Sequence, residues 1–217
     1  MINITGIKGV LFDLDGVLID SMPHHVAAWQ KIFEDFGIHV DSLIFRLSEG
    51  EKAGFTIRRL AKEYGLEWSD EEFDSLIAKK RAIYRSNAPR GMRPDAQRAV
   101  TFCRTKGLKT AIVTGSVKSN LNWTLSDSER GLFDYILSSE DYKNSKPHPE
   151  PYQNAARKLR LDPDECLVVE NAPLGIRSAK NAGMICIALT STLPADILDE
   201  ADLVVPSLDE LPDLWNI

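Results

Sequence analysis

The stretch Gly9-Val-Leu-Phe-Asp-Leu-Asp-Gly-Val-Leu-Ile-Asp20 decides the fold of this chain. Its apolar run from Val10 to Phe12 predicts a short buried strand, and two acidic residues, Asp13 and Asp15, follow that strand directly. Residues two apart on an extended chain face the same side, so the two carboxylates would repel each other. A bound cation would remove that repulsion and leave one carboxylate to act as a nucleophile and the other to move protons. Taken alone, the pattern also fits a turn that ends a strand, because Asp and Gly favour turns.

The composition is that of an ordinary globular protein of 217 residues, with 43% hydrophobic and 27% charged residues. A net charge of −6 argues against a nucleic-acid partner, since such binders carry a basic surface. The sequence has neither an apolar run of about 18 residues, as a membrane span needs, nor the start of a signal peptide. We therefore expect a cytoplasmic protein with no membrane partner, and its size and charge favour a monomer. Cys103, Cys166 and Cys186 lack metal-ligand spacing and are expected to be buried, reduced thiols.

Apolar runs alternate with helical patterns in the second half of the chain. Strands are predicted at 10–12, 109–114, 135–138, 166–170, 184–189 and 203–206, and helices at 94–106, 116–126, 149–161, 173–182 and 208–215. Such alternation implies right-handed crossovers and a parallel sheet with helices on both faces. The predicted fold class is therefore α/β, with a Rossmann-like parallel sheet as its core.

The segment between the first strand and this alternating region shows helical periods only. Helices are predicted at about 21–36, 54–64 and 69–86, and the stretch 41–50 is expected to be a loop. Ser69 and Glu72 form a capping-box pattern at the start of the last of these helices. We therefore predict two domains, an α/β catalytic core of residues 1–19 and 92–217 and an inserted helical-bundle cap of residues 20–91.

Residues that suit phosphate chemistry follow several of the predicted strands. Ligands of open parallel sheets bind at the carboxyl ends of the strands, so these residues should meet at one edge. The segment Thr114–Ser116 offers a hydroxyl, an open amide and a helix start, which together suit an anion. Lys146 precedes a rigid Pro-His-Pro turn and can pair with carboxylate or phosphate oxygens, while Glu170 and Asn171 offer oxygen ligands for Mg²⁺. Each feature alone has an ordinary explanation as a helix cap or a surface charge, and the combination is far more specific.

The four segments resemble the motifs of the haloacid dehalogenase superfamily, in its β-phosphoglucomutase-like phosphatase branch, and the resemblance covers essentially the whole chain. In order along the chain, the matching motifs are Asp13-Leu-Asp-Gly-Val17, Val113-Thr-Gly-Ser116, Lys146-Pro-His-Pro-Glu-Pro151 and Val168-Val-Glu-Asn-Ala-Pro-Leu-Gly175. The helical insert after the first strand also stands where this family has its cap.

The resemblance implies an Mg²⁺-dependent phosphohydrolase that works through an aspartyl-phosphate. Asp13 would be the nucleophile, and Asp15 would protonate the leaving oxygen and then activate water. Thr114, or the neighbouring amides of Gly115 and Ser116, would hold the transferring phosphoryl group, and Lys146 would orient Asp13 and the phosphate. Asp15 argues against true dehalogenation, because dehalogenases of this superfamily typically lack the second aspartate.

The resemblance also implies a metal site formed by Asp13, the backbone carbonyl of Asp15, and Glu170 with or without Asn171. Relatives often carry two acids in the fourth motif, whereas Asn171 is neutral here, so Mg²⁺ affinity should fall unless another acid compensates. Glu49 is a candidate, because a cap residue in Ser48-Glu-Gly-Glu-Lys52 could reach the metal or its substrate when the cap closes. A solvated loop acid is an equally good interpretation of this residue.

Two cap features bear on the substrate. Lys52 is the one basic residue of the cap loop, which argues against a mutase that must hold a bisphosphate, and favours a small phosphorylated metabolite or inorganic pyrophosphate. His25 stands where mutases of this branch place a histidine that supports the acid/base aspartate, although it could also face water at a helix start. The alternatives are a β-phosphoglucomutase-type phosphosugar mutase and, in another class, a non-catalytic phosphate-binding or interaction protein.

Overall fold

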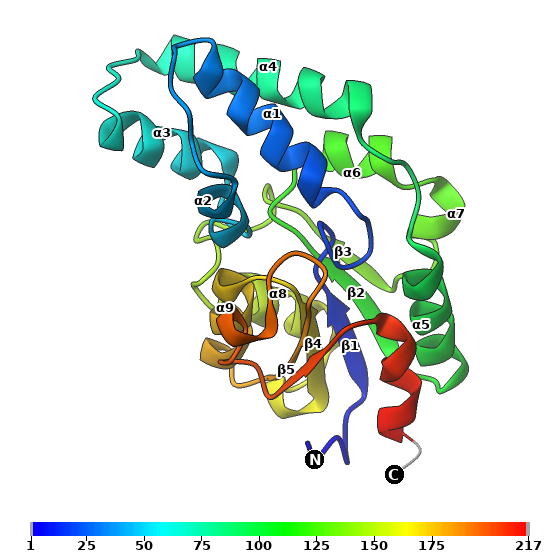
Figure 1. Cartoon of the computed structure of the whole chain (residues 1–217). Coiled ribbons are helices and arrows are strands. Elements are labelled where there is room, and N and C mark those ends of the chain that lie inside the picture. The colour runs from blue at the N-terminus through cyan, green and yellow to red at the C-terminus, as the bar shows by residue number, and fades with distance from the viewer. Residues whose placement is uncertain (1, 216–217) are drawn as a thin grey trace.

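A six-stranded parallel sheet forms the centre of the computed structural model, which describes residues 2–215 (Figure 1). The strands, in the spatial order β3-β2-β1-β4-β5-β6, are β1 (Gly9–Phe12), β2 (Lys109–Val113), β3 (Tyr135–Leu137), β4 (Cys166–Glu170), β5 (Ile185–Leu189) and β6 (Leu203–Val205). Each neighbouring pair is parallel. The predicted α/β fold and the positions of its strands are confirmed.

Strand β1 holds the central position because its side chains are buried on both faces of the sheet. Val10 and Phe12 pack into one hydrophobic cluster, and Leu11 packs into the other. The register pairs Phe12 with Ile112 of β2 and with Val169 of β4. The residues that follow β1 are therefore flanked by the ends of β2 and β4, as the rule for parallel sheets predicts.

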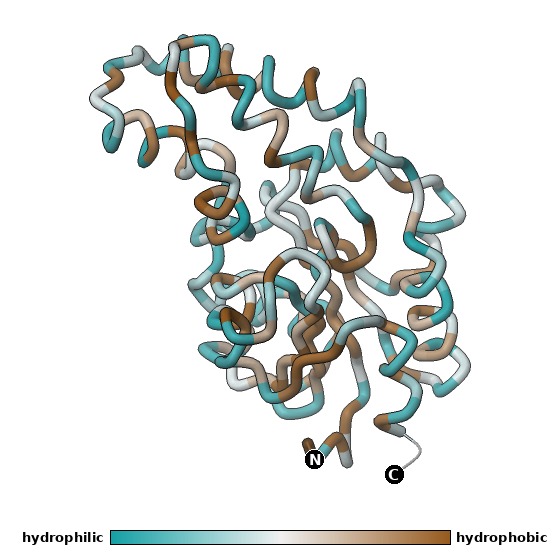
Figure 2. The backbone as a smooth tube through the Cα atoms, in the orientation of Figure 1, coloured by the Kyte–Doolittle hydropathy of each residue, from teal (hydrophilic) through white to brown (hydrophobic). Residues whose placement is uncertain are grey.

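Helices cover both faces of the sheet (Figure 1). The first cluster contains residues of α5 (Pro94–Thr105) and of the 3₁₀ segment η3 (Leu208–Trp215), and the second contains residues of α8 (Glu150–Leu159) and α9 (Pro173–Asn181). The remaining core elements are α6 (Lys118–Thr124), α7 (Asp127–Arg130), η1 (Pro163–Glu165) and η2 (Ala195–Ile197). Figure 2 shows hydrophobic stretches along the central strands and a mixture of hydrophilic and hydrophobic residues on the helices.

Four helices lie between β1 and α5 in the sequence and have a hydrophobic cluster of their own. They are α1 (Met22–Glu34), α2 (Ser42–Leu47), α3 (Ala53–Glu63) and α4 (Asp70–Asn87). Val26 and Phe33 of α1, Leu60 of α3 and Phe73 of α4 belong to this cluster, and α1 and α4 lie side by side (Figure 1). The division into core and cap domains at 20 and 91 stays a proposal, and this separate cluster supports it.

The expectation of a loop over residues 41–50 is wrong, because α2 occupies part of it. The Asp41 side chain accepts a hydrogen bond from the Leu43 backbone at 2.8 Å, and Phe45 is buried against the cap cluster. One and a half turns are too short to show a helical period in the sequence. The capping box of Ser69 and Glu72 is confirmed, whereas the helix expected at 116–126 is the shorter α6 followed by α7.

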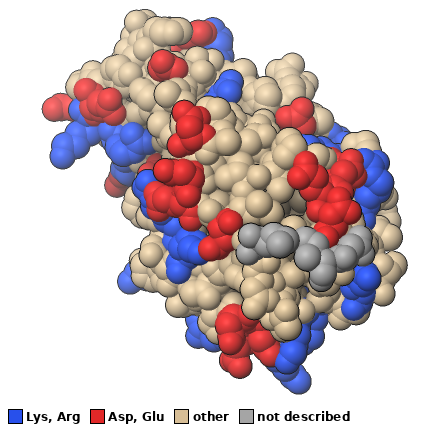
Figure 3. Space-filling view, turned by 60° about the horizontal axis from the view of Figure 1, so that its bottom comes forward, with Lys and Arg blue, Asp and Glu red and all other residues tan. Residues whose placement is uncertain are grey.

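The three cysteines are buried and free, as predicted. Among residues 2–215, no helix has both the length and the hydropathy needed to span a membrane. On the face shown in Figure 3, basic side chains are interspersed with acidic side chains and with uncharged surface.

Candidate active site

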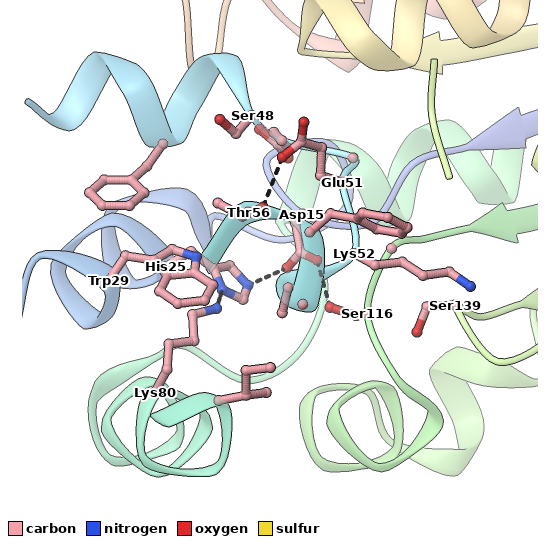
Figure 4. Close-up of a pocket in the computed structure, with 18 of the residues that line it drawn as sticks. Asp15, His25, Trp29, Ser48, Glu51, Lys52, Thr56, Lys80, Ser116 and Ser139 are labelled. Atoms are coloured by element: carbon pink, nitrogen blue, oxygen red, sulfur yellow. Dashed lines mark hydrogen bonds and ion pairs between the residues drawn. The ribbon is translucent and has the colours of Figure 1, made fainter. Parts of the chain in front are cut away.

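A cavity of about 460 Å³ lies where the four inserted helices face the carboxyl ends of the central strands. From the core it is lined by Asp13, Asp15, Gly115, Ser116, Val117, Asn120 and Ser139, and from the inserted segment chiefly by His25, Trp29, Glu49, Glu51, Lys52, Phe55, Arg58, Ile77, Lys80 and Arg81. Figure 4 shows many of these side chains, which come from both parts of the chain. The structure thus brings residues far apart in the sequence to one cavity.

Lys146 connects two buried carboxylates beneath the cavity. Its ammonium donates to Asp13 Oδ1 and to Glu170 Oε1, both at 2.6 Å, and to the Val113 carbonyl at 3.2 Å. The Lys146 side chain is 1% exposed, so the desolvation cost of its charge is offset only by these partners. Burial alone would lower the pKa of Lys146, but Asp13 and Glu170 outweigh it and hold that pKa above its usual range. Burial also raises the pKa of Asp13 to about 8, against the opposing effect of Lys146.

Both oxygens of Glu170 accept hydrogen bonds from the protein. Besides Lys146, the Tyr152 hydroxyl donates to Oε1 at 2.5 Å, and the Asn171 backbone donates to Oε2 at 3.1 Å. Gly175 packs against the same carboxylate, and a Cβ atom there would lie 1.9 Å from Oε1. Glu170 is therefore fixed from several sides and does not line the cavity. Its role as a metal ligand stays a prediction.

Asp15 is held by three donors at the cavity wall. Ser21 Oγ donates to Oδ1 at 2.6 Å, Ser116 Oγ donates to Oδ2 at 3.0 Å, and His25 Nε2 lies 3.0 Å from Oδ1. Burial would raise the pKa of Asp15, but His25 and the two hydroxyls outweigh it and keep that pKa below its usual range. These contacts fix the direction of the carboxylate, which a proton-transfer group requires (Figure 4).

His25 joins Asp15 to the inserted helix α4. Its Nδ1 lies 2.6 Å from Lys80 Nζ, and its ring stacks on Tyr84 with centroids 4.0 Å apart. Burial lowers the pKa of His25, and the neighbouring Lys80 lowers it further. The structure therefore places His25 beside the acidic residue, in the position that the resemblance implied, with Lys80 as a second partner that the sequence did not reveal.

The segment Thr114–Ser116 leaves β2 and reaches the cavity through its last two residues. Thr114 is 1% exposed and its hydroxyl accepts from the Ser116 backbone at 3.0 Å, so its side chain shapes the turn. Gly115 and Ser116 line the cavity. The Gly115 Cα lies close to the inserted loop, since a Cβ there would be 3.4 Å from the carbonyls of Gly50 and Glu51.

Glu49 and Asn171 meet across the junction of the inserted segment and the core. Asn171 Nδ2 donates to Glu49 Oε2 at 2.9 Å and to Thr192 Oγ1 at 2.7 Å. Burial raises the pKa of Glu49 well above its usual value, and the nearby Asp13 and Asp15 raise it further. Glu49 Oε1 and Asn171 Oδ1 are both buried, and neither has a hydrogen-bond partner among the described residues. Glu49 is thus not the solvated loop acid of the alternative interpretation.

The donor set at this junction suits a hard cation such as Mg²⁺. Within residues 2–215, no group of three His, Cys, Asp or Glu side chains is arranged to hold a metal. Two carboxylates, Asp13 and Glu49, can however be complemented by the Asn171 amide oxygen and a backbone carbonyl, and Mg²⁺ accepts such a mixture together with water. The two unpartnered oxygens are the observation that a cation would explain, since buried polar atoms normally have partners.

The inserted loop lies against the core through further contacts. Lys52 donates to the carbonyl of Tyr142 at 2.7 Å, and the Tyr142 hydroxyl donates to the Thr114 carbonyl at 3.2 Å. Gly50 adopts a φ of +92°, and a Cβ there would meet the Lys146 side chain at 3.0 Å. Lys52, the basic residue singled out in the sequence, is therefore bound to the core. Lys80, Arg58 and Arg81 add basic groups to the cavity from α3 and α4, where helical spacing alone did not identify them.

Comparisons with known proteins agree with this geometry. The model of the haloacid dehalogenase-like hydrolase family matches residues 7–183. Validoxylamine A 7'-phosphate phosphatase of Streptomyces hygroscopicus subsp. limoneus is 29% identical over 94% of this chain and 95% of that protein, and hexitol phosphatase A of Escherichia coli is 29% identical over 94% and 93%. A putative β-phosphoglucomutase from Bacteroides vulgatus superposes with a TM-score of 0.85 at 33% identity, covering 97% of this chain and 88% of that one. The resemblance of the motifs is confirmed, and the chain belongs to the haloacid dehalogenase-like hydrolases.

Proposed function

We propose that this hydrolase is an Mg²⁺-dependent phosphatase that cleaves a small organic phosphate ester through a phosphorylated Asp13. The observation that carries the proposal is the position of Asp13, which lines the cavity while Lys146 holds its Oδ1 at 2.6 Å. Phosphoryl transfer needs little beyond positioning and neutralised charge, and this arrangement supplies both. As the family is one of hydrolases, the alternative of a non-catalytic phosphate-binding protein is not kept.

In the first step, Asp13 attacks phosphorus with the carboxylate oxygen that Lys146 does not hold. The electron pair of the broken P–O bond passes to the leaving-group oxygen, which takes a proton from Asp15. In the second step, Asp15 takes a proton from water, the water oxygen attacks the aspartyl-phosphate, and inorganic phosphate leaves with Asp13 restored. The three contacts to the Asp15 carboxylate fix its direction, and because they favour its ionised form they support its second-step role as a base.

The transferring phosphoryl group would lie against Gly115 and Ser116. Both line the cavity beside Asp15, and Gly115 has no side chain to cover its backbone amide on the cavity side. Thr114 supports this segment through its bond to the Ser116 backbone. The Lys146 ammonium would face the same oxygens and reduce their negative charge, because it lies beside the attacking carboxylate.

Mg²⁺ would be held by Asp13, the Asp15 backbone carbonyl, Asn171 and Glu49, with Glu170 fixing Lys146 in place. When bound, the cation supplies positive charge to the phosphate oxygens and keeps the carboxylates from repelling one another. The two unpartnered oxygens support the inclusion of Glu49 and Asn171, and the full engagement of Glu170 by protein donors argues for its indirect role. Ethylenediaminetetraacetate should therefore abolish activity and added Mg²⁺ should restore it.

An organic ester is favoured over inorganic pyrophosphate by the size and lining of the cavity. Its volume of about 460 Å³ lies within the range of about 300–1,000 Å³ typical of pockets for small organic ligands. Trp29, Phe55 and Ile77 line it, and these apolar side chains would pack against an organic group but gain nothing from a purely ionic substrate. The similar phosphatases from Streptomyces and E. coli, named for organic phosphates, also support this choice. Pyrophosphate stays the second candidate, because Glu49 supplies an additional carboxylate for a metal complex.

The test is phosphate release from a panel of sugar phosphates, polyol phosphates, nucleotides and pyrophosphate, with Mg²⁺, by the wild type and by Asp13→Asn. We expect turnover of organic esters and a loss of at least about a thousand-fold in the variant, as for other nucleophile replacements. Thermal unfolding of the variant shows whether it is folded. Equal phosphate release by the two proteins would overturn the proposal. Conversion of β-glucose 1-phosphate to the 6-phosphate, primed by the bisphosphate and faster than release, would instead identify a mutase, the activity for which the similar Bacteroides vulgatus protein is named.

A further inference from the structure

The basic side chains that line the cavity differ in whether they already have a hydrogen-bond or ion-pair partner within the protein. Lys52 donates to the Tyr142 carbonyl at 2.7 Å. Arg58 pairs with Asp70 at 2.8 Å and covers the Phe73 ring, and Lys80 Nζ lies 2.6 Å from His25. Each of these cations thus has a structural partner before any ligand binds.

Among the described basic residues that line the cavity, Arg81 is the one whose side chain has no such partner. It is half-buried, and its guanidinium forms neither a hydrogen bond nor an ion pair with any residue from 2 to 215. Its neighbours on α4 are engaged, since Lys79 donates to Asp35 at 2.7 Å and Arg85 donates to Asn120 at 2.8 Å. A guanidinium that lines a cavity without a protein partner keeps all its donors available to a ligand.

Arg81 lines the cavity from α4, whereas the acidic residues Glu49 and Glu51 line it from the inserted loop. Figure 4 shows Lys80 and α4 on the far side of His25 from Glu51, which belongs to the inserted loop. The Glu51 carboxylate already accepts a hydrogen bond from the Thr56 hydroxyl at 3.0 Å and forms an ion pair with Arg59 at 3.7 Å. Ile77, one helical turn before Arg81, lines the same wall and gives it an apolar border. The α4 side of the cavity therefore combines an apolar surface with an unpaired positive charge.

We propose that Arg81 binds an oxyanion carried by the leaving group, so that the preferred substrate is a phosphate ester whose organic part bears a second negative group, a carboxylate or another phosphate. This inference rests on the proposed function, because it describes the leaving group of that reaction. The planar guanidinium suits either anion through paired hydrogen bonds. Arg81 adds a basic group from α4 to the cap loop, where Lys52 is the one basic residue.

The experiment compares kcat/KM for matched pairs of esters with the wild type and Arg81→Gln. Glycerol 3-phosphate and 3-phosphoglycerate differ by a carboxylate, and fructose 1-phosphate and fructose 1,6-bisphosphate differ by a phosphate. We expect the wild type to prefer the anionic member of at least one pair. In Arg81→Gln that preference should fall by about ten-fold or more, since a hydrogen bond to a charged group contributes about that factor. The pair that responds distinguishes the carboxylate from the phosphate.

Lys79→Gln is the matched control, because it removes one positive charge from the same helix outside the cavity lining. It should keep the wild-type preference. An equal fall for both members of each pair in Arg81→Gln, or the same fall in Lys79→Gln, would overturn the role of Arg81. So would a wild type that turns over neutral and anionic esters equally. Absence of turnover on every ester would overturn the proposed function itself, which separates the two failures.

Discussion

Two buried lysines, one on each side of the active site, show how differently the core and the inserted helices treat charge. Lys146 in the core is 1% exposed and contacts two carboxylates at 2.6 Å. Lys80 on α4 is 6% exposed, and its partners are the His25 ring nitrogen and the faces of Trp29 and Tyr84. The core thus pairs its buried ammonium with carboxylates, whereas the inserted helices place a buried ammonium beside neutral partners.

The pKa values follow this difference. The two carboxylates raise the pKa of Lys146 despite its burial, while burial lowers the pKa of Lys80 to about 8. Removing the cation of a compensated buried pair leaves its carboxylates unpaired and costs stability, whereas a buried charge without a counter-charge itself costs stability. The same substitution, lysine to methionine, should therefore act in opposite directions at the two positions.

Lys146→Met is expected to have the largest effect. It leaves Asp13 and Glu170 buried without their cation, and removing one member of a buried ion pair costs about 3–5 kcal/mol. The free energy of unfolding, measured with urea, should fall by that amount, and phosphate release should be lost. Lys8→Met, which breaks an exposed pair with Glu165, is the control and should change neither. A stable, active Lys146→Met protein would contradict the account of the core given above.

Lys80→Met is expected to stabilise the protein near neutral pH. The unfolded chain holds the Lys80 proton with a pKa near 10.5 and the folded protein with a pKa of about 8, so the unfolded state binds more protons between these values. The unfavourable contribution of Lys80 is therefore complete below pH 8 and fades as the pH rises to 10.5. Replacing it should gain about 1–3 kcal/mol near pH 7, which is the removed burial cost less the lost contact to His25.

The charged groups that face Lys80 do not change this sign. Asp15, from the loop after β1, favours the charged form, and Arg81, from the same helix, opposes it, while burial is the largest influence. Urea unfolding of the wild type and of Lys80→Met near pH 7 and near pH 10 gives the measurement. The stability difference between the two proteins should be larger at pH 7. A Lys80→Met protein that is less stable at pH 7 would show that the inserted helices compensate this charge after all.

The same contrast explains what the sequence could predict. Asp13 and Thr114 follow strands, Glu170 ends one and Lys146 precedes a rigid turn, so topology brings their backbones to one edge of the sheet. The direction of the Asn171 side chain toward Glu49 could not be predicted, because it depends on how the inserted loop lies on the core.

The inserted helices were predicted less completely for physical reasons. α2 is too short for a helical period to be visible in the sequence. Lys80 and Arg81 lie next to each other in a run of charged residues, and helical spacing does not distinguish a cavity-lining charge from a solvated one. The side chains with which the inserted helices line the cavity are therefore what a single sequence reveals least.

Tyr152→Phe should have the smallest of these effects and would sharpen the comparison within the core. The Tyr152 hydroxyl is buried and donates to Glu170 Oε1, which also accepts from Lys146, so its removal leaves a carboxylate that still has a strong partner. The expected loss in the free energy of unfolding is about 0.5–1.5 kcal/mol, as for one hydrogen bond, far less than for Lys146→Met. Tyr135→Phe is the control, because the described residues contain no hydrogen-bond partner for the half-buried Tyr135 hydroxyl. A loss as large as that of Lys146→Met would contradict this expectation. It would mean that the Tyr152 hydroxyl, and not the Lys146 ammonium, is the main partner of the Glu170 carboxylate.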